Sequence, residues 1–365
     1  MDVREFDFNL PPELIAQDPA PERGGARLLL LDRASGHFRH TFIAALPDLL
    51  HPGDLVVVNN TRVFPARLMG HRVPSGGAAE CLLIARVHSG PDPAGAAHHR
   101  TGSADGAESW EALVHPGAKL RPGARMVFEG AVSLHAEILE RRTFGRRLVR
   151  LWTDDGSPIE RAVDLIGHVP LPPYIRRGDE HVDRERYQTL FAARRGSVAA
   201  PTAGLHFSEA LVRALGEREV EIVEITLHVG YGTFQPVRVE RVEDHRMERE
   251  QYSIDRPVAD AINRARDEGR RVIAVGTTTT RTLEAVAFAH DGRIVEGSGA
   301  TDLFIFPGFR FQVIAGLLTN FHLPRSSLLM LASAFAGRDR VLAAYREAVA
   351  QRYRFYSYGD GMLVL

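Results

Sequence analysis

The stretch Arg271-Val272-Ile273-Ala274-Val275-Gly276-Thr277-Thr278-Thr279-Thr280-Arg281 contains the clearest fold signal in the chain. Its run 272–275 is short, apolar and rich in β-branched residues, which is typical of a strand buried on both faces. After the turn, apolar residues return at helical spacing, at Leu283, Val286 and Ala287. A buried strand that leads directly into a helix is the unit of a parallel α/β sheet. We therefore expect an α/β fold around this stretch.

Other segments repeat the α/β pattern on both sides of this stretch. Residues 55–58 are an apolar run behind a Pro-Gly-Asp turn, and residues 220–229 alternate as a strand that stops at Gly230. A very apolar helix is predicted from Ser326 or Ser327 through residue 334. Residues 355–358 and 362–365 predict an edge or terminal strand that finishes the chain.

Between residues 63 and 152 the pattern changes to short alternating runs separated by turn residues, without a helical period. This change predicts a small all-β, barrel-like domain of residues 63–152, inserted near the N-terminal third. The main α/β domain is then discontinuous and comprises residues 1–62 and 153–365. Residues 89–109 are rich in Gly, Ala, Pro and Ser, and we expect them to form a flexible loop of the inserted domain.

The composition excludes several classes of protein. The chain has 365 residues, 44% of them hydrophobic and 25% charged, with a net charge of -1, which are ordinary globular proportions. Its single cysteine, Cys81, excludes disulfide frameworks, Cys-based zinc sites and iron–sulfur clusters. No apolar run reaches the roughly 18 residues of a membrane helix, and no secretory signal is visible. We expect a cytosolic protein without a membrane anchor.

Common catalytic motifs are missing from the sequence. The only lysine, Lys119, belongs to no phosphate-binding loop, and neither a His-Glu-x-x-His nor a Gly-x-Ser-x-Gly motif occurs. These absences argue against ATP-driven, zinc-protease and serine-hydrolase chemistry. Arginine pairs such as Arg176-Arg177 and Arg194-Arg195 are either solvated surface or the lining of a groove that contacts phosphates.

Five polar loops lie at predicted strand ends, where open α/β sheets place their ligands. These loops are residues 59–62, 200–207, 226–234, 276–281 and 319–327. The threonines and arginine of 276–281 either cap a helix only or hold a carboxylate or phosphate at its N-terminus. His228 is either a structural strand residue or a group beside a ligand that the following glycines admit. Together the five loops predict a shared crevice, walled by turns from both domains.

Nine short segments occur in order along the whole chain: 6–11 (FDFNLP), 59–63 (NNTRV), 171–175 (LPPYI), 186–189 (RYQT), 201–207 (PTAGLHF), 227–234 (LHVGYGTF), 276–281 (GTTTTR), 318–324 (LTNFHLP) and 356–360 (YSYGD). In combination they resemble the S-adenosylmethionine:tRNA ribosyltransferase-isomerase family of queuosine biosynthesis. The loop of residues 89–109 is longer than this family usually carries, which puts no catalytic residue in doubt.

The resemblance implies a reaction. The ribosyl group of S-adenosylmethionine would be transferred and isomerised onto the aminomethyl group of 7-aminomethyl-7-deazaguanine at the tRNA wobble position. The products would be epoxyqueuosine-tRNA, adenine and methionine. S-adenosylmethionine would be a co-substrate, with no cofactor, and the partner would be the tRNA anticodon stem-loop. The resemblance also implies an α/β domain with a β-barrel domain, and we expect a monomer.

The chemistry suggests which residues take part. A sulfonium acidifies the C–H bonds beside it, so a positioned base can begin the ribose rearrangement without a metal. Histidine suits proton transfers near neutral pH, so we expect His228 or His322 to perform one, with His206 as the third candidate. Thr277 to Thr280 would hold the methionine carboxylate or a ribose hydroxyl. The predicted substrate-binding residues are Asn60, Arg62, Thr202, Gly204, Tyr231, Thr277, Thr278, Thr279, Thr280, Asn320, Arg325, Tyr356 and Asp360.

Two other functions fit parts of the sequence. An S-adenosylmethionine-dependent tRNA methyltransferase would use the same co-substrate, but its glycine-rich loop after the first strand is missing. A non-catalytic RNA-binding protein would explain the arginines and aromatic residues but would leave the polar loops without a purpose. Adenine and methionine as products indicate ribosyl transfer, whereas S-adenosylhomocysteine indicates methylation.

Overall fold

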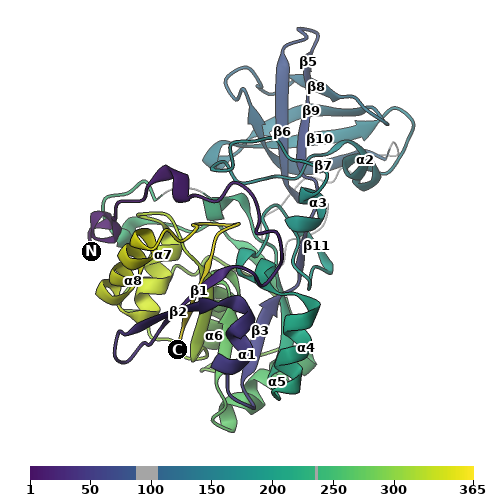
Figure 1. The fold of residues 1–365 in the computed structure, drawn as a ribbon. Coiled ribbons are helices and arrows are strands. Elements are labelled where there is room, and N and C mark those ends of the chain that lie inside the picture. The colour runs from purple at the N-terminus through teal and green to yellow at the C-terminus, as the bar shows by residue number, and fades with distance from the viewer. Residues whose placement is uncertain (88–105, 235–236) are drawn as a thin grey trace.

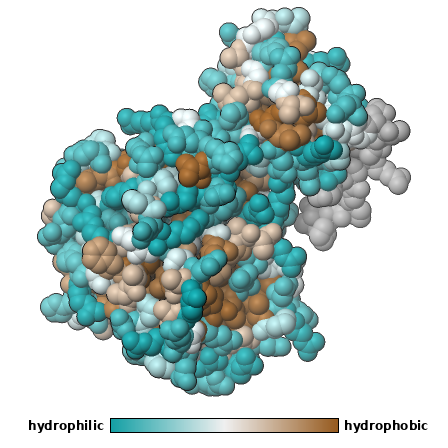
Figure 2. Space-filling model, turned by 45° about the vertical axis from the view of Figure 1, so that its right-hand side comes forward, coloured by the Kyte–Doolittle hydropathy of each residue, from teal (hydrophilic) through white to brown (hydrophobic). Residues whose placement is uncertain are grey.

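The computed structural model describes residues 1–87, 106–234 and 237–365. It contains an α/β body built on a nine-stranded sheet and a closed six-stranded barrel, which lies at the upper right of Figure 1. In the space-filling view the barrel is a separate lobe, and on the face shown hydrophilic residues predominate, with apolar patches on both lobes (Figure 2). This architecture confirms the predicted fold class. Among the described residues, no helix is long and apolar enough to cross a membrane.

The large sheet has the strand order β15-β13-β12-β3-β14-β16-β17-β1-β2. The bounds of its strands are β1 Arg27–Leu31, β2 Phe38–Phe42, β3 Leu55–Asn59, β12 Glu221–Leu227, β13 Glu250–Ile254, β14 Val272–Val275, β15 Gly297–Thr301, β16 Gly316–Asn320 and β17 Gly361–Val364. Strands β12, β3, β14 and β16 are parallel to one another, and β17 and β1 run antiparallel to them. The carboxyl ends of the four parallel strands therefore lie at the same edge of the sheet as the amino ends of β17 and β1.

Helices cover both faces of this sheet because its central strands are apolar on both sides. Val57 of β3 packs into a core that includes apolar residues of α5, α6, α7 and α8, whereas Val56 and Val58 pack on the other face with those of α1 and α4. The helices of the chain are α1 Leu46–Leu49, α2 Ile159–Ile166, α3 Asp183–Arg186, α4 Glu209–Glu217, α5 Arg256–Asp267, α6 Thr277–Ala289, α7 Ser327–Ala336 and α8 Arg338–Ala350. Short 3₁₀ turns occupy Val3–Phe6, Pro12–Leu14, Ile43–Ala45, Thr143–Gly145, Thr202–His206, Tyr231–Phe234 and Val242–Asp244.

The barrel closes in the order β10-β7-β6-β5-β8-β9, and every pair in it is antiparallel. Its strands are β5 Arg67–Val73, β6 Ala78–Arg86, β7 Glu108–His115, β8 Arg125–Phe128, β9 Leu134–Arg141 and β10 Arg146–Thr153. At Gly70 the strands approach so closely that a Cβ atom would lie 2.1 Å from the Val127 carbonyl oxygen. The barrel therefore has a packed core of its own, separate from that of the α/β body.

A short two-stranded sheet connects the two bodies. Strand β4 (Thr61–Val63) directly follows β3 and pairs in parallel with β11 (Arg194–Ser197). The barrel consequently follows the carboxyl end of β3, on the side of the sheet where the polar loops lie. Helix α2 packs against the barrel core. The boundaries at residues 62/63 and 152/153 stay a prediction.

Two local predictions differ from the structure. Strand β17 is the last strand of the chain, as one of the two alternatives predicted, but it lies inside the sheet between β16 and β1 and not at an edge; residues 355–358 form no strand. An apolar run of four residues cannot show how many neighbours it has, because that depends on strands distant in sequence. Most of the predicted loop 89–109 lies outside the described residues, but Glu108 and Ser109 already belong to β7 and pair with β10.

Glu284 of α6 anchors the segment that precedes β16. Its fully buried carboxylate accepts the backbone N–H groups of Gln312, Val313 and Ile314 at 2.7, 3.0 and 3.1 Å. We expect Glu284→Ala to lower the free energy of unfolding by about 3 kcal/mol or more, because it leaves these N–H groups unpaired. Urea denaturation measures the loss. Glu217→Ala, at an exposed glutamate of α4, is the control, and an equally small effect of both changes would contradict the anchoring role.

Candidate active site

A cavity lies at the sheet edge where β14 and β16 end. It has an empty volume of about 490 Å³, which includes space open to solvent. Its lining residues are Ala200, Pro201, Thr202, Ala203, Val229, Thr233, Gly276, Thr277, Thr278, Thr319, Asn320, His322, Leu328, Tyr356 and Ser357. We call this space the active-site cavity. Four of the five predicted loops meet here, and only residues 59–62 do not line it.

Among the described residues, every lining residue of the active-site cavity belongs to the α/β body, and none belongs to the described part of the barrel. The described lining of this cavity therefore comes from one domain, whereas we expected a crevice walled by turns from both. The physical reason is that parallel strands bring their own turns together at one edge of the sheet.

The amino end of α6 opens into the active-site cavity. Its N-cap, Gly276, has a φ of 89°, a left-handed conformation that glycine adopts without strain, and no side chain caps the helix. Thr277 and Thr278 line the cavity, and the buried hydroxyl of Thr278 has no hydrogen-bond partner in the described part of the chain. Free N–H groups at a helix N-terminus attract anions. This end of α6 is thus suited to a carboxylate or phosphate.

The rest of the predicted threonine loop is used by the fold. The hydroxyls of Thr279 and Thr280 donate to the carbonyls of Val275 and Gly276 at 2.8 and 3.1 Å, and both side chains are fully buried. Two of the four threonines are therefore committed to the helix. The turn of the helix points these two side chains away from the cavity, whereas Thr277 and Thr278 line it.

Arg281, at the end of the same loop, is also committed to the fold. It forms a buried ion pair with Glu250 at 2.6 Å, and Glu250 in turn accepts the backbone N–H of Gly230 at 2.9 Å. The positive charge of Arg281, which the sequence analysis assigned to a possible ligand, is consequently neutralised by Glu250. The ion pair holds the loop after β12 in position instead.

Asn320, at the end of β16, joins three walls of the cavity. Its side-chain oxygen accepts from the Thr202 hydroxyl at 3.2 Å, and its amide nitrogen donates to the Tyr356 carbonyl at 3.2 Å. These contacts orient the amide, so the same nitrogen faces Nε2 of His206 at 3.3 Å. Nε2 of His206 must accept there, which places the ring proton on Nδ1.

Only one of the three candidate histidines lines the active-site cavity. His322 does so, with Nε2 2.8 Å from the Thr319 hydroxyl, and burial lowers its pKa to about 3. His206 lies behind Asn320, and burial lowers its pKa to about 4. His228 precedes the lining residue Val229, and burial also lowers its pKa. Because all three pKa values are lowered, the imidazoles are neutral at pH 7.

Two hydroxyls hold His228. Its Nδ1 lies 2.8 Å from the Thr61 hydroxyl, which lies 2.7 Å from that of Ser197, and Ser197 accepts the N–H of Val229 at 2.7 Å. The ring packs on Gly196, where a Cβ atom would lie 2.6 Å from it. Thr61 lies in the predicted loop 59–62, but it was not among the predicted site residues. Gly196 and Ser197 were not predicted either; their only signal was Gly196, which stands beside an arginine pair that resembles solvated surface.

Tyr356 and Ser357 form the remaining wall. Tyr356 is a buried aromatic residue with a φ of 74°, a strained conformation that costs on the order of 1–3 kcal/mol. Its ring packs edge-to-face on Tyr174, with the ring centroids 3.9 Å apart, and the Tyr174 hydroxyl bonds to that of Ser357. Ser357 and Tyr174 were not among the predicted site residues. Their signal was their place inside the segments YSYGD and LPPYI.

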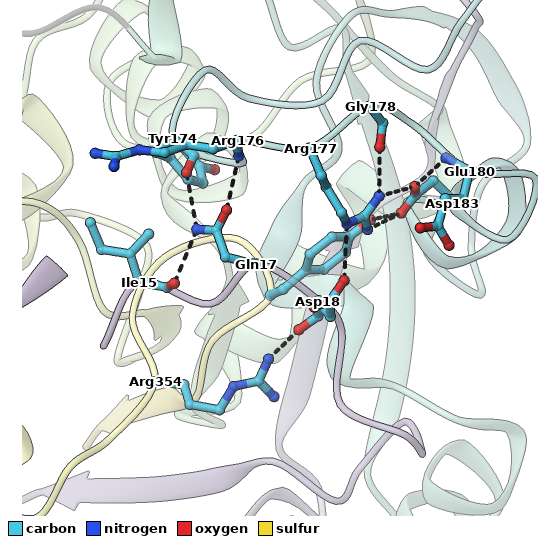
Figure 3. A network of polar contacts seen from close by, with 11 residues as sticks. Ile15, Gln17, Asp18, Tyr174, Arg176, Arg177, Gly178, Glu180, Asp183 and Arg354 are labelled. Carbon is cyan, nitrogen blue, oxygen red and sulfur yellow. Dashed lines mark hydrogen bonds and ion pairs between the residues drawn. The ribbon is translucent and has the colours of Figure 1, made fainter. Parts of the chain in front are cut away.

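A polar network around Arg177 and Asp183 lies near Tyr174, which packs on this wall (Figure 3). Asp183 is fully buried and accepts from Arg177 at 2.6 and 2.9 Å and from the Tyr358 hydroxyl at 2.9 Å. Arg177 also donates to Asp18 at 2.9 Å. Burial alone would raise the pKa of Asp183, but the hydrogen bonds it accepts together hold that pKa below its ordinary value. The N-terminal, linker and C-terminal segments are thus joined beside the cavity.

Three predicted binding residues lie toward the barrel. The side-chain oxygen of Asn60 accepts from the Thr226 hydroxyl at 2.7 Å, and Arg62 is exposed on β4. Tyr231 packs against the barrel core. None of the three lines the active-site cavity.

Three others have structural partners away from the cavity. Arg325 is exposed and pairs with Asp7 at 3.3 Å, and Asp360 pairs with Arg27 at 3.1 Å. Gly204 packs so closely that a Cβ atom would lie 2.9 Å from Thr189. Within the described ranges, no group of three or more His, Cys, Asp or Glu residues could hold a metal ion.

Fold and site together define an α/β protein with an attached β-barrel and a cavity, lined by polar and apolar residues, at the carboxyl edge of its parallel strands. A model of the family described as "Queuosine biosynthesis protein" matches residues 3–364, and the chain belongs to this family. The chain is 49% identical, over the full length of both, to a protein of Heliobacterium modesticaldum named S-adenosylmethionine:tRNA ribosyltransferase-isomerase. A protein of the same name from Geobacter sulfurreducens is 48% identical over 99% of each chain.

A solved structure shows the same similarity. It is the S-adenosylmethionine tRNA ribosyltransferase of Thermotoga maritima, which is 35% identical. The match covers 99% of this chain and 100% of that one, with a TM-score of 0.54.

We expect the buried histidines to make stability depend on pH. An unfolded histidine has a pKa of about 6.5, whereas the folded values are about 4 for His206 and about 3 for His322. Below pH 6.5 the unfolded chain binds protons that the folded chain does not. The stabilisation is therefore complete above that pH and is lost as pH falls toward the folded values, by up to about 1.4 kcal/mol per pH unit for each histidine.

Urea denaturation between pH 7 and 5 measures this slope. His206→Gln should reduce the slope, because it removes one of the buried histidines that cause it. His51→Gln, at an exposed histidine, should leave it unchanged. A wild-type slope in the His206→Gln variant would disprove the assignment.

Proposed function

We propose that this chain is an S-adenosylmethionine:tRNA ribosyltransferase-isomerase. It transfers and isomerises the ribosyl group of S-adenosylmethionine onto the aminomethyl group of 7-aminomethyl-7-deazaguanine at the tRNA wobble position. One observation carries the proposal: nearly half of all residues are identical, over the entire length, to relatives of that name. A cavity with polar walls at the sheet edge supports it.

The cavity suits the co-substrate. S-adenosylmethionine has a carboxylate, ribose hydroxyls and a sulfonium in one molecule. The uncapped N-terminus of α6 and the unpaired hydroxyl of Thr278 suit the carboxylate or a ribose hydroxyl. Thr202 and Asn320, on the opposite loops, supply further polar contacts at the same cavity. We propose S-adenosylmethionine as co-substrate, without a cofactor.

We propose that His322, which lines the cavity, moves a proton. The sulfonium acidifies the neighbouring C–H group, and because burial lowers the pKa of His322, its imidazole is neutral and has a lone pair that can accept the proton. The imidazolium then passes this proton to departing adenine. During the reaction a ribose-derived carbon bonds to the aminomethyl nitrogen, and the ribose carbons close into a five-membered carbocycle that carries an epoxide. The C–S bond to methionine and the glycosidic bond to adenine break. Of the two protons lost, from the C–H group and from the amine, one goes to adenine and one to solvent.

His228 and His206 act further from the substrate in this arrangement. His228 is held by Thr61 next to the lining residue Val229, and His206 orients Asn320. We propose that the tRNA anticodon stem-loop presents the reacting base and that a monomer performs the reaction. A tRNA substrate places this activity in the cytoplasm.

The direct test is product analysis. The protein is incubated with S-adenosylmethionine and an anticodon stem-loop that contains the aminomethyl-deazaguanine, and the RNA is weighed by mass spectrometry. We expect epoxyqueuosine in the RNA, with one adenine and one methionine released per modified base. S-adenosylhomocysteine would instead indicate a methyltransferase, and RNA retention without consumption of the co-substrate would indicate a binding protein.

A second arm of this experiment tests the base. His228→Ala combined with His322→Ala should reduce turnover by roughly 10²–10⁴-fold, the usual contribution of a general acid or base. Full turnover in the double variant would remove both histidines from the chemistry.

Thr278 should affect binding of the co-substrate. We expect Thr278→Val to raise the KM for S-adenosylmethionine by roughly tenfold or more, because it removes a hydrogen bond to a charged group. Thr278→Ser, which keeps the hydroxyl, should be close to wild type. The control is Thr282→Val, one turn along the helix, where the hydroxyl donates to the Thr278 carbonyl at 3.1 Å. Equal KM values in all variants would contradict the subsite.

A further inference from the structure

A second cavity adjoins the active-site cavity. It has an empty volume of about 350 Å³, including space open to solvent, and is lined chiefly by residues 19–26 and 357–359 together with Arg186 and His206. Ser357 lines both cavities. Residues 19–26 lead to β1 and residues 357–359 lead to β17, so the second cavity lies at the same sheet edge as the first.

Two arginines of this second cavity have no acidic partner. Arg23 donates to the carbonyls of Glu185, Gln188 and Leu205 at 3.0, 2.7 and 3.3 Å. Arg186 donates to the carbonyl of Pro21 at 3.1 Å and to that of Ala20. Among the described residues, neither guanidinium forms an ion pair with a carboxylate, although the exposed Glu22 lines the same cavity.

Neighbouring arginines of the same region are neutralised. Arg27 pairs with Asp360, and Arg177 pairs with Asp183 and Asp18. Arg23 and Arg186 therefore stand out as two like charges beside one hollow. Burial and the positive charge of Arg186 both lower the pKa of Arg23. An anion placed between two guanidiniums would relieve this repulsion, and guanidinium forks match the oxygens of phosphate.

The position of this charge indicates which anion. A nucleotide whose base enters the active-site cavity carries backbone phosphates on both sides, and these must lie at the rim of that cavity. Ser357 is common to both cavities, so the cavity that the two arginines line adjoins the active-site cavity. Phosphate contacts of this kind position a nucleic acid without reading its sequence.

We propose that Arg23 and Arg186 bind a backbone phosphate of the RNA substrate next to the reacting nucleotide. This inference rests on the proposed function, because it needs an RNA substrate. It assigns the second cavity to the RNA backbone and leaves the active-site cavity to the base and S-adenosylmethionine.

Arg186 is the residue to change, because it is less enclosed by carbonyls than Arg23. Arg186→Gln removes the charge, whereas Arg186→Lys keeps the charge and loses the fork that holds two carbonyls. If Arg186 binds a phosphate, RNA binding depends on its positive charge. If Arg186 only holds the two carbonyls in place, RNA binding depends on the forked shape of its guanidinium group. Arg340→Gln is the matched control: Arg340 donates to the carbonyls of Arg33 and Ala34 at 2.8 and 3.1 Å and lines a different cavity.

The experiment measures binding of the anticodon stem-loop at several salt concentrations, together with the KM for RNA and for S-adenosylmethionine. We expect Arg186→Gln to weaken RNA binding about tenfold and to reduce the slope of log K against log salt by about 1, the value for one phosphate. The KM for RNA should rise, with the KM for S-adenosylmethionine unaffected. Arg186→Lys should retain most of the affinity and the wild-type slope, and Arg340→Gln should match wild type.

Three results would overturn the inference. An unchanged salt slope in Arg186→Gln would show that no phosphate binds there. Equal losses in Arg186→Gln and Arg186→Lys would show a structural clamp. A change in the KM for S-adenosylmethionine alone would assign the arginines to the carboxylate of the co-substrate. Failure of the wild-type protein to release adenine would instead reject the proposed function, and the salt slope for RNA would still decide the phosphate contact.

Discussion

The parallel alignment of β12, β3, β14 and β16 is the constraint on which the rest of the structure depends. Parallel strands end at one edge, so turns that lie far apart in sequence meet there. The antiparallel entry of β17 and β1 brings two further segments to the same edge, and these form the Tyr356–Ser357 wall and the second cavity. Both cavities therefore result from strand direction, and the described part of the barrel contributes no residue to either.

Buried polar side chains then fix the turns relative to one another. Asn320 connects three loops, Arg281 and Glu250 hold the loop after β12, and Asp183 binds Arg177 and Tyr358. Each of these groups is expensive to bury unless it is paired, so each pairing selects one arrangement of the loops. The hydroxyl of Thr278, by contrast, has no partner in the described part of the chain. This is expected of a group that binds a ligand and not of one that holds the fold together.

Much of the fold could be predicted because its signals are local. The run 272–275 indicated a buried strand, and the change of pattern at residue 63 indicated an all-β insertion; both follow from side-chain periodicity. The location of β17 inside the sheet could not be predicted, because a strand of four apolar residues looks the same at the edge and inside. The site was predicted as a group of loops, but not residue by residue. Thr278 and Thr279 are identical in type, and only the phase of α6 turns one toward the cavity and the other into the core.

The amino-acid sequence by itself determined the α/β class, the presence of a barrel, the family and the loops that carry polar residues. These depend on composition, periodicity and short segments, all of which act over a few residues. Only the tertiary structure decided that His322 lines the active-site cavity while His206 lies behind Asn320, that Arg281 is neutralised by Glu250, and that Arg23 and Arg186 lack an acid. The reason is physical: burial, charge pairing and hydrogen-bond direction depend on neighbours that the chain brings together from distant positions.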